Sequence, residues 1–222
     1  TASIQAMLAA PGLDPTHRAL ALGSVLEVCR DTAEGQFDDI AGTFAPLARV
    51  SPADVLQVYR LKTARYTFEG PLKAGALLAG ATPAVIEALS VFGTHAGIAF
   101  QLVDDLLGLF GDEAATGKPA LADLREAKKT WPLLTAYARA TVDEQDYLGE
   151  LMLRGDANAY DLAKVRSLVR RTGALDASVA MVRDLIERAE AALDLLERTD
   201  AVSPVEELRN LAAWLAAQAE SF

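Results

Sequence analysis

The sequence predicts an all-α protein. Three observations lead to this fold class: repeated helix-start motifs, apolar residues at helical spacing, and no segment that alternates apolar and polar residues long enough to favour a β-strand. Several pairs place a good N-cap residue before proline, which is typical of a helix start because an N–H at that position has no partner within the helix. These pairs are Asp14-Pro15, Ser51-Pro52, Thr82-Pro83 and Ser203-Pro204.

Between these motifs the segments present apolar faces typical of helices. Asp54 and Glu144 lie three residues after Ser51 and Thr141, which is the spacing of a capping box. Gly173 should end the helix that precedes it. The apolar residues recur every three or four positions, as on buried helix faces. The sets are Val55, Val58, Tyr59 and Leu61; Val165, Leu168 and Val169; and Val179, Val182, Leu185 and Ile186.

Composition limits the class of protein. We expect a single all-helical domain over residues 1–222, because 51% of the residues are hydrophobic and no linker or internal repeat is visible. A net charge of −10 argues against nucleic acid as a partner. The single cysteine, Cys29, favours a reducing cytoplasm and should be a small core residue.

The helix predicted over residues 82–110 is apolar almost all round, so we expect it to be central. Its uncharged stretch, residues 88–103, is shorter than the roughly 20 residues of a bilayer span. We therefore predict a buried helix and no transmembrane segment.

Two adjacent aspartates, Asp104 and Asp105, interrupt this apolar helix. Burying an unpaired carboxylate costs several kcal/mol, so the pair should face either water or cations. Gln101 lies one turn earlier and can point into the same cavity. Carboxylates with water and phosphate suit Mg²⁺. A solvated pair at a helix edge, or an aspartate bonded to a neighbouring helix end, is the alternative.

Basic residues follow in a turn-rich segment. Gly117-Lys118 is not a P-loop, because Pro119 stands where Ser or Thr should bind the metal. Lysines here can be solvated surface residues, or they can supply positive charge for a diphosphate. Lys62 lies upstream in a largely apolar helix, with Tyr66 four residues on, and can instead snorkel to the surface. Gly35 within a helix predicts a kink or close packing.

Together these elements closely resemble the trans-isoprenyl diphosphate synthases, or polyprenyl synthetases, over about residues 20–134. The resemblance implies an isoprenoid-synthase-type helical bundle around a central cavity. It also implies condensation of isopentenyl diphosphate with an allylic diphosphate to give geranyl, farnesyl, geranylgeranyl or longer products, with several Mg²⁺ ions. The motifs are Gly35-Gln36-x-x-Asp39, Lys62-Thr63-Ala64, Phe100-Gln101-x-x-Asp104-Asp105, Gly111-Asp112, Gly117-Lys118, Asp123 and Lys128-x-Thr130.

The resemblance also assigns residue roles. Lys62, Asp104, Asp105 and Lys128 should be catalytic. The metal ligands should be Asp104, Asp105 and, through water, Asp123. The substrates should contact Lys62, Thr63, Tyr66, Phe100, Gln101, Lys118 and Lys128, with Tyr66 and Phe100 lining the cavity near the reacting carbons.

The sequence departs from the family pattern in three places. Gly108 replaces the last aspartate of Asp-Asp-x-x-Asp, and Asp112 is a candidate to compensate. Ala127 stands where the family often has glycine. The first aspartate-rich motif, which in the family lies upstream of the part matched by residues 1–10, is absent. We expect that N-terminal helices are missing and that this chain alone is inactive.

Three other functions stay open. The protein can be a non-catalytic or regulatory homologue, or a helical scaffold in which the aspartates are solvated or paired with basic residues. A class I terpene cyclase shares the fold and the use of metal, but it does not need Lys62, Lys118 and Lys128. A homodimer is the family expectation.

Overall fold

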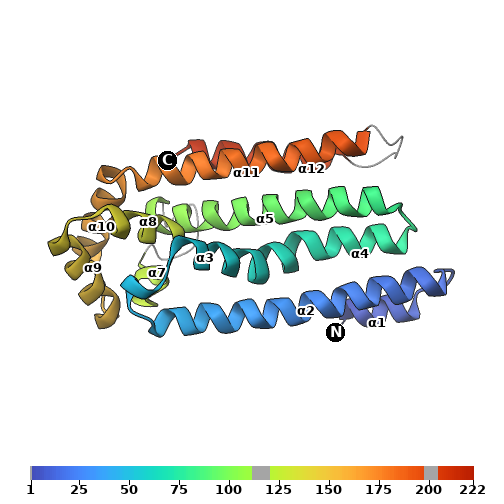
Figure 1. The fold of residues 1–222 in the computed structure, drawn as a ribbon, viewed down its shortest axis with the longest axis horizontal. Helices are drawn as coiled ribbons and strands as arrows, with labels where there is room; N and C mark the ends of the chain where they lie inside the picture. Colours follow the sequence, from blue (N-terminus) through green and yellow to red (C-terminus); the bar gives the residue numbers. More distant parts are fainter. Residues whose placement is uncertain (1, 112–120, 198–204) are drawn as a thin grey trace.

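The computed structural model describes residues 2–111, 121–197 and 205–222. Within these ranges every regular element is helical, which confirms the all-α prediction. The long helices lie in a stack, with α11 above α5, then α3 and α4, then α2, while α7 to α10 gather at one end (Figure 1). The start motif at Ser203-Pro204 lies outside the described residues.

The chain begins with α1 (Ala2–Ala9) and the long α2 (Pro15–Phe44). Asp14 caps α2 as predicted, because its side chain accepts hydrogen bonds from two backbone N–H groups of the first turn. Cys29 is exposed, so its prediction as a core residue is wrong. The buried side of α2 is set by the residues that meet neighbouring helices, and Cys29 points away from that side. The buried residues are Ala21, Ser24, Val28, Asp31 and Gly35.

A continuous helical rod follows α2, after the short 3₁₀ turn η1 (Leu47–Arg49). It begins at the predicted capping box of Ser51 and Asp54. Its middle part is a π-helix, in which hydrogen bonds run to the fifth neighbour and which is frequent at functional sites. The parts of the rod are α3 (Pro52–Val58), η2 (Tyr59–Glu69) and α4 (Gly70–Leu78).

Glycines let the neighbouring helices approach η2 closely. A Cβ added to Gly35 of α2 would lie 2.7 Å from the Leu61 Cβ, and one added to Gly97 would lie 2.5 Å from the Ala64 Cα. Any larger residue at either position would therefore push the helices apart. The close packing predicted from Gly35 is confirmed.

The central helix is α5 (Pro83–Phe110), which packs against η2 and α11. Thr82 caps it as predicted. By length and apolar composition alone α5 could cross a membrane, but half of its most apolar window is buried inside the protein.

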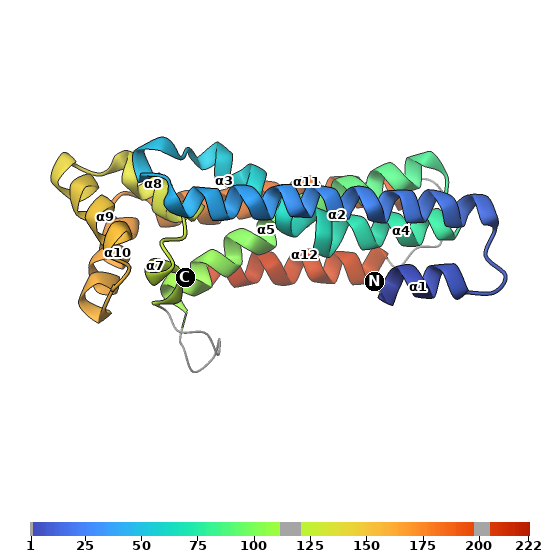
Figure 2. The ribbon, with the colours of Figure 1, turned by 90° about the horizontal axis from the view of Figure 1, so that it is seen from below.

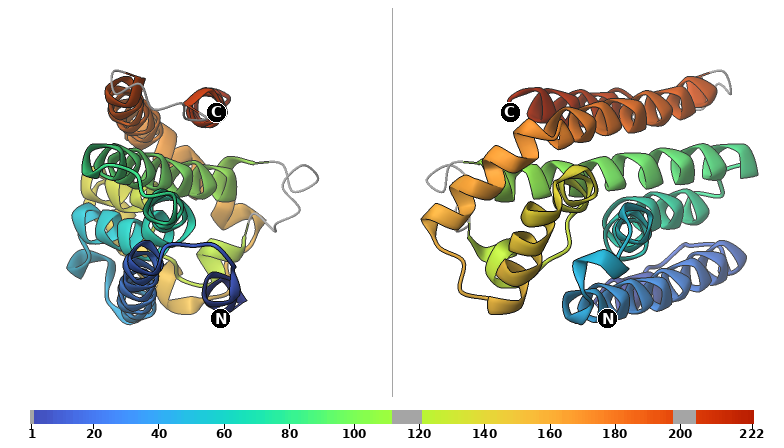
Figure 3. Two further views of the ribbon diagram at one scale, coloured as in Figure 1. Left: turned by 90° about the vertical axis from the view of Figure 1, so that its right-hand side faces the viewer. Right: turned by 60° about the vertical axis from the view of Figure 1, so that its left-hand side comes forward.

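The remaining helices complete the bundle and cover one of its ends. α11 packs against α5 and α12, and α8 to α10 lie where α2 and α5 end (Figures 2 and 3). Arg166 of α10 donates to the Leu109 carbonyl in the last turn of α5. Gly173, with φ of 67°, ends α10 as predicted. The elements are α7 (Ala122–Arg125), α8 (Trp131–Arg139), α9 (Val142–Arg154), α10 (Ala159–Arg171), α11 (Ala174–Glu197) and α12 (Val205–Glu220).

Candidate active site

The site is centred on Asp105, which lies in the last part of α5. The side chain of Asp105 is fully buried. The Tyr59 hydroxyl donates to its Oδ2. Gln101 Nε2 donates to its Oδ1 over 3.1 Å, and Lys128 Nζ lies 3.2 Å from the same oxygen. Both carboxylate oxygens are therefore engaged, and the buried negative charge has a lysine partner.

Burial raises the pKa of Asp105 to about 6, although Lys128, Tyr59 and Gln101 all favour its ionised form. Burial alone would lower the pKa of Lys128, but Asp105 and Asp123 outweigh it and raise that pKa well above its usual value. Burial, together with Asp105, also raises the pKa of Tyr59. At neutral pH the site therefore holds a charged lysine, an ionised aspartate and a neutral tyrosine.

Tyr59 joins three helices at this point. It is the first residue of η2, it donates to Asp105 of α5, and its hydroxyl oxygen accepts a 2.9 Å hydrogen bond from the Trp131 N–H at the start of α8. That N–H has no partner within α8. Tyr59 appeared in the sequence only as one member of an apolar helix face, so its role was missed.

Lys128 reaches the site from the segment between α7 and α8. Its backbone N–H donates to the Asp123 carbonyl over 2.9 Å, which closes a tight turn. Ala127 within this turn has φ of 52°, in the left-handed region that favours glycine. The turn thus explains why a glycine suits this position in the resembling family.

Asp123 of α7 brings a second carboxylate. Its Oδ1 lies 3.6 Å from Lys128 Nζ, and its Oδ2 lies 2.5 Å from the point that a Cβ on Gly108 would occupy. Asp104 is partly exposed and lies one turn before Gly108 on α5. Both Asp104 and Asp123 help to raise the pKa of Lys128, so both carboxylates act on the same ammonium group.

The other predicted residues divide into three groups. Lys62 pairs with Asp39 of α2, and the Thr63 hydroxyl donates to Gln101 Oε1 over 2.9 Å, so η2 is tied to both α2 and α5. Phe100 packs against Phe68 with ring centroids 5.5 Å apart. Lys118 and the compensating residue Asp112 lie outside the described residues.

Tyr66 is 61% exposed. Its predicted alignment with Lys62 assumed α-helical spacing, whereas η2 is a π-helix, in which a residue four positions on is not one full turn away. Its contact with substrate stays a prediction.

A buried polar network that the sequence did not reveal holds η2 in place. Arg65 donates to Asp31 of α2 over 2.9 Å and to Glu69 over 2.7 Å. Glu69 also accepts from Ser90 and Thr94 of α5. The spacing of Arg65 and Glu69 was the only local signal, because the other partners come from distant helices.

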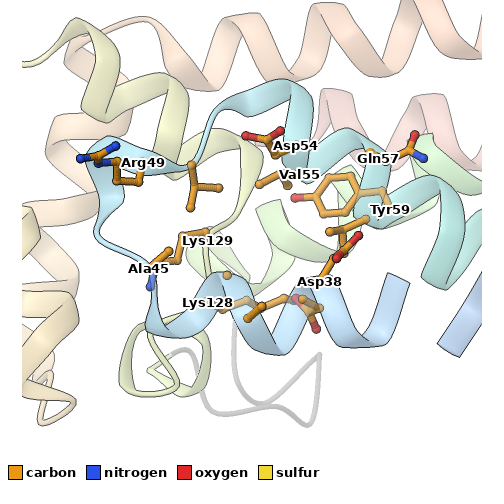
Figure 4. Close-up of a pocket in the computed structure, with 14 residues that line it drawn as sticks. Asp38, Ala45, Arg49, Asp54, Val55, Gln57, Tyr59, Lys128 and Lys129 are labelled. Atoms are coloured by element: carbon orange, nitrogen blue, oxygen red, sulfur yellow. The ribbon is translucent and has the colours of Figure 1, made fainter. Parts of the chain in front are cut away.

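A pocket of about 400 Å³ opens beside the site (Figure 4). Tyr59 reaches it from η2 and Lys128 from the segment before α8. Its other polar walls come from the end of α2, from η1 and α3, and from the segment before α8. The polar residues around it are Asp38, Asp39, Arg49, Asp54, Gln57 and Lys129.

The donor set suits a metal shared with a phosphate ligand. Among the described residues no three His, Cys, Asp or Glu side chains form a group that could hold a metal ion by themselves. Mg²⁺ usually keeps several waters and takes one or two carboxylates together with substrate phosphates. Asp104 and Asp123 fit that arrangement, whereas the Asp105 carboxylate already accepts from Lys128, Gln101 and Tyr59.

Comparison with known proteins identifies the family. Residues 3–169 match the model of the polyprenyl synthetase family. The chain is 38% identical over 162 residues to geranylfarnesyl diphosphate synthase of Aeropyrum pernix, covering 73% of this chain and 49% of that protein. It is 34% identical over 199 residues to (2E,6E)-farnesyl diphosphate synthase of Mycobacterium tuberculosis, covering 78% and 55%. The chain thus spans about half the length of these relatives.

The fold is also shared. Geranylgeranyl pyrophosphate synthase of Corynebacterium glutamicum, solved with isoprenyl diphosphate and magnesium, superposes with a TM-score of 0.80 at 35% identity, over 93% of this chain and 57% of that one. Geranylgeranyl pyrophosphate synthetase of Pyrococcus horikoshii gives a TM-score of 0.83 at 26% identity, over 96% and 63%. On its sequence, its fold and the residues gathered around Asp105, this chain belongs to the polyprenyl synthetase family.

Proposed function

We propose that this chain supplies the second aspartate motif and the lysines of a trans-prenyltransferase. The enzyme would condense isopentenyl diphosphate with an allylic diphosphate to give a longer all-trans polyprenyl diphosphate. The observation that carries the proposal is the ion pair of the fully buried Asp105 with the partly buried Lys128, whose ammonium group also feels the carboxylates of Asp104 and Asp123. A scaffold would also pair Asp105 with a basic residue, but it needs no further carboxylates, Asp104 and Asp123, acting on the same lysine.

The proposed chemistry is loss of diphosphate from the allylic substrate. Diphosphate leaves readily only when its negative charge is neutralised, which Mg²⁺ supplies when bound. Asp104 and Asp123 would hold the metal, and the Lys128 ammonium would contact a diphosphate oxygen. Metal ligation by Asp105 stays a prediction, since in this arrangement its carboxylate holds Lys128 in place.

Lys62 would contact the diphosphate from the other side. It pairs with Asp39, with both side chains partly exposed, so a more highly charged anion can compete for its ammonium group. Thr63 would orient Gln101 through the 2.9 Å hydrogen bond between them. The apolar residues around Phe100 would keep water from the allylic cation, which would otherwise be trapped as an alcohol.

The finer expectations belong to the same proposal. They are binding of several Mg²⁺ ions, assembly as a homodimer and a cytoplasmic location. The resemblance carries the first two, and the single cysteine carries the third.

Replacing Asp104 tests the function directly. Asp104→Ala in the complete protein should lower turnover of isopentenyl and allylic diphosphates by about 100- to 1,000-fold, because it removes a contact that stabilises the transition state. The matched control is Asp143→Ala, on an exposed position of α9, which should leave turnover unchanged. Equal turnover of both variants would eliminate the metal role. A complete protein without any turnover would instead favour a non-catalytic homologue.

A further inference from the structure

Lys62 and Lys128, the two described lysines of the predicted site, are neutralised in different ways. Lys128 is paired with Asp105, whose side chain is fully buried and accepts two further hydrogen bonds. Lys62 is paired with Asp39 of α2 over 2.5 Å, and the two side chains keep 35% and 25% of their surface exposed. Removing one partner of a buried pair is strongly destabilising, whereas a partly exposed pair contributes little and opens easily. Asp39 is therefore the partner that can be exchanged.

The Asp39 carboxylate serves Lys62 alone within the described part of the chain. Among the residues that the structure describes, this carboxylate and the Lys62 ammonium group have no ion-pair or hydrogen-bond partner except each other. Asp39 comes from the motif Gly35-Gln36-x-x-Asp39, of which helix packing explains only the glycine. A carboxylate that neither caps a helix nor joins a larger network points to a role toward Lys62 itself.

The position of Asp39 opposes the binding of an anion. Asp39 and Lys128 both line the pocket of about 400 Å³, with Asp38 beside them (Figure 4). A diphosphate in contact with Lys128 would therefore approach the Asp39 carboxylate, and like charges repel. The same carboxylate holds Lys62, whose ammonium group must leave it before it can contact the diphosphate. Both effects lower the affinity of the site for diphosphate.

We propose that Asp39 is an exchangeable counter-ion for Lys62. It holds the ammonium group in the empty site, gives it up to a bound diphosphate and takes it back as the diphosphate leaves. This inference rests on the proposed function, in which Lys62 contacts the diphosphate. Binding a diphosphate equally tightly in every state adds nothing to the rate of the chemical step, and the proposed reaction must release pyrophosphate. Asp39 is thus a positioning residue that favours release.

Pyrophosphate affinity tests the exchange. Calorimetry of the complete protein with inorganic pyrophosphate and Mg²⁺ should show a Kd about 3- to 10-fold lower for Asp39→Asn than for wild type, which is within the range of coupling between neighbouring groups. The change removes a charge and keeps the shape of the side chain. Asp38→Asn is the matched control, because Asp38 is exposed, lines the same pocket and has no ion pair among the described residues. It should change Kd by less than about twofold, since salt screens exposed charges.

A second background separates the freeing of Lys62 from general repulsion. Lys62→Gln should raise Kd, because an ammonium contact is lost. In that background Asp39→Asn should lower Kd no more than Asp38→Asn does, since no ammonium group is left to free. Stopped-flow measurements should also show slower dissociation of pyrophosphate from Asp39→Asn than from wild type, because no carboxylate reclaims Lys62. The same gain in both backgrounds, or an unchanged dissociation rate, would overturn the proposal.

Failure of the proposed function would look different. If the wild-type protein binds no pyrophosphate with Mg²⁺, or if Lys62→Gln binds it as well as wild type does, the proposed function loses its diphosphate contact. If Lys62→Gln binds more weakly but Asp39→Asn binds no more tightly than Asp38→Asn, only the inference about Asp39 is overturned. Weaker binding by Asp39→Asn would overturn it too, because Asp39 would then itself support the metal. Where Lys62→Gln binds too weakly to measure, the comparison of Asp39→Asn with Asp38→Asn decides.

Discussion

At the scale of single residues, Tyr59 does more than its apolar surroundings suggest. One hydroxyl group donates to a buried carboxylate and accepts the first N–H of α8. Hydrogen bonds that involve a charged group are worth about twice as much as neutral ones. The position of Asp105, and through it that of Lys128, therefore depends on a buried tyrosine from another helix.

Tyr59→Phe should destabilise the protein by about 2–3 kcal/mol, because it leaves a buried carboxylate oxygen and a buried N–H without their shared partner. Chemical denaturation would measure the loss. Tyr160→Phe removes a hydroxyl from a tyrosine that is 73% exposed, and it should change stability by less than about 0.5 kcal/mol. Similar values for the two variants would show that the Tyr59 hydroxyl contributes little.

Ala127 is a position where a substitution should stabilise the protein. Backbone strain from an alanine in the left-handed region lowers the free energy of unfolding by about 1–2 kcal/mol. Glycine avoids this strain, but the greater freedom that it gives the unfolded chain lowers the free energy of unfolding by about 0.4–1 kcal/mol. Ala127→Gly should therefore raise the free energy of unfolding by up to about 1 kcal/mol. Ala180→Gly, at an exposed position inside α11, should lower it instead, because glycine weakens a helix interior. A lower stability for Ala127→Gly would mean that the turn imposes no strain.

At the scale of elements, η2 is held by close packing and by buried charge. Gly35 and Gly97 let α2 and α5 approach its backbone, and Arg65 bridges Asp31 and Glu69 across the same junction. Since η2 carries Tyr59, Lys62 and Thr63, this junction fixes where three candidate site residues lie.

The Asp31–Arg65 pair makes stability depend on pH. Burial raises the pKa of Asp31, but Arg30 and Arg65 outweigh it and hold that pKa below its ordinary value. The pair therefore stabilises the fold above pH of about 4, and this contribution is lost as the pH falls through the lowered pKa. Asp31→Asn should lower the melting temperature at pH 7, and its difference from wild type should shrink in acid.

The matched control for this prediction is Asp184→Asn, which breaks an exposed pair with Arg188 on α11. Pairs of this kind contribute little, so its melting temperature should follow that of the wild type at every pH. A constant difference between Asp31→Asn and wild type from pH 7 down to pH 2 would rule out the linkage.

At the scale of the whole molecule, the candidate site lies where α2 and α5 end and α8 begins. If the site binds Mg²⁺ and a diphosphate, the folded chain should gain about 2.7 kcal/mol at a ligand concentration 100 times Kd. For a chain of this size that corresponds to a rise in melting temperature of about 5–10 °C. Inorganic pyrophosphate with Mg²⁺ is the test, and Mg²⁺ with inorganic sulfate is the control. A melting temperature indifferent to both would favour the scaffold.

The parts of the fold that could be predicted are those set by interactions between neighbouring residues in the sequence. The helix starts at Asp14, Ser51 and Thr82 were correct because an N-cap and its proline act within one turn. Cys29 was placed wrongly because the buried side of α2 is chosen by its neighbours. The π-helix was also missed; it lies where α2 and α5 approach η2 closely.

The sequence singled out Gln101, Asp105 and Lys128, which the structure brings together, but it did not reveal how they are arranged. Asp104 and Asp105 look equivalent in the sequence, and only packing distinguishes the buried acid from the partly exposed one. Tyr59 is separated from Asp105 by 46 positions and from Trp131 by 72, so no spacing rule could connect them. The space at Gly108 is likewise filled from another element.

The hydrogen bond from the Trp131 amide to Tyr59 has a consequence for how the protein forms. This bond can protect the amide from solvent exchange only after η2 and the start of α8, which lie 72 positions apart in the sequence, have docked, so the amide reports formation of that contact. In a deuterium-labelling time course of refolding, its protection should come late, after that of the interior amides of α11.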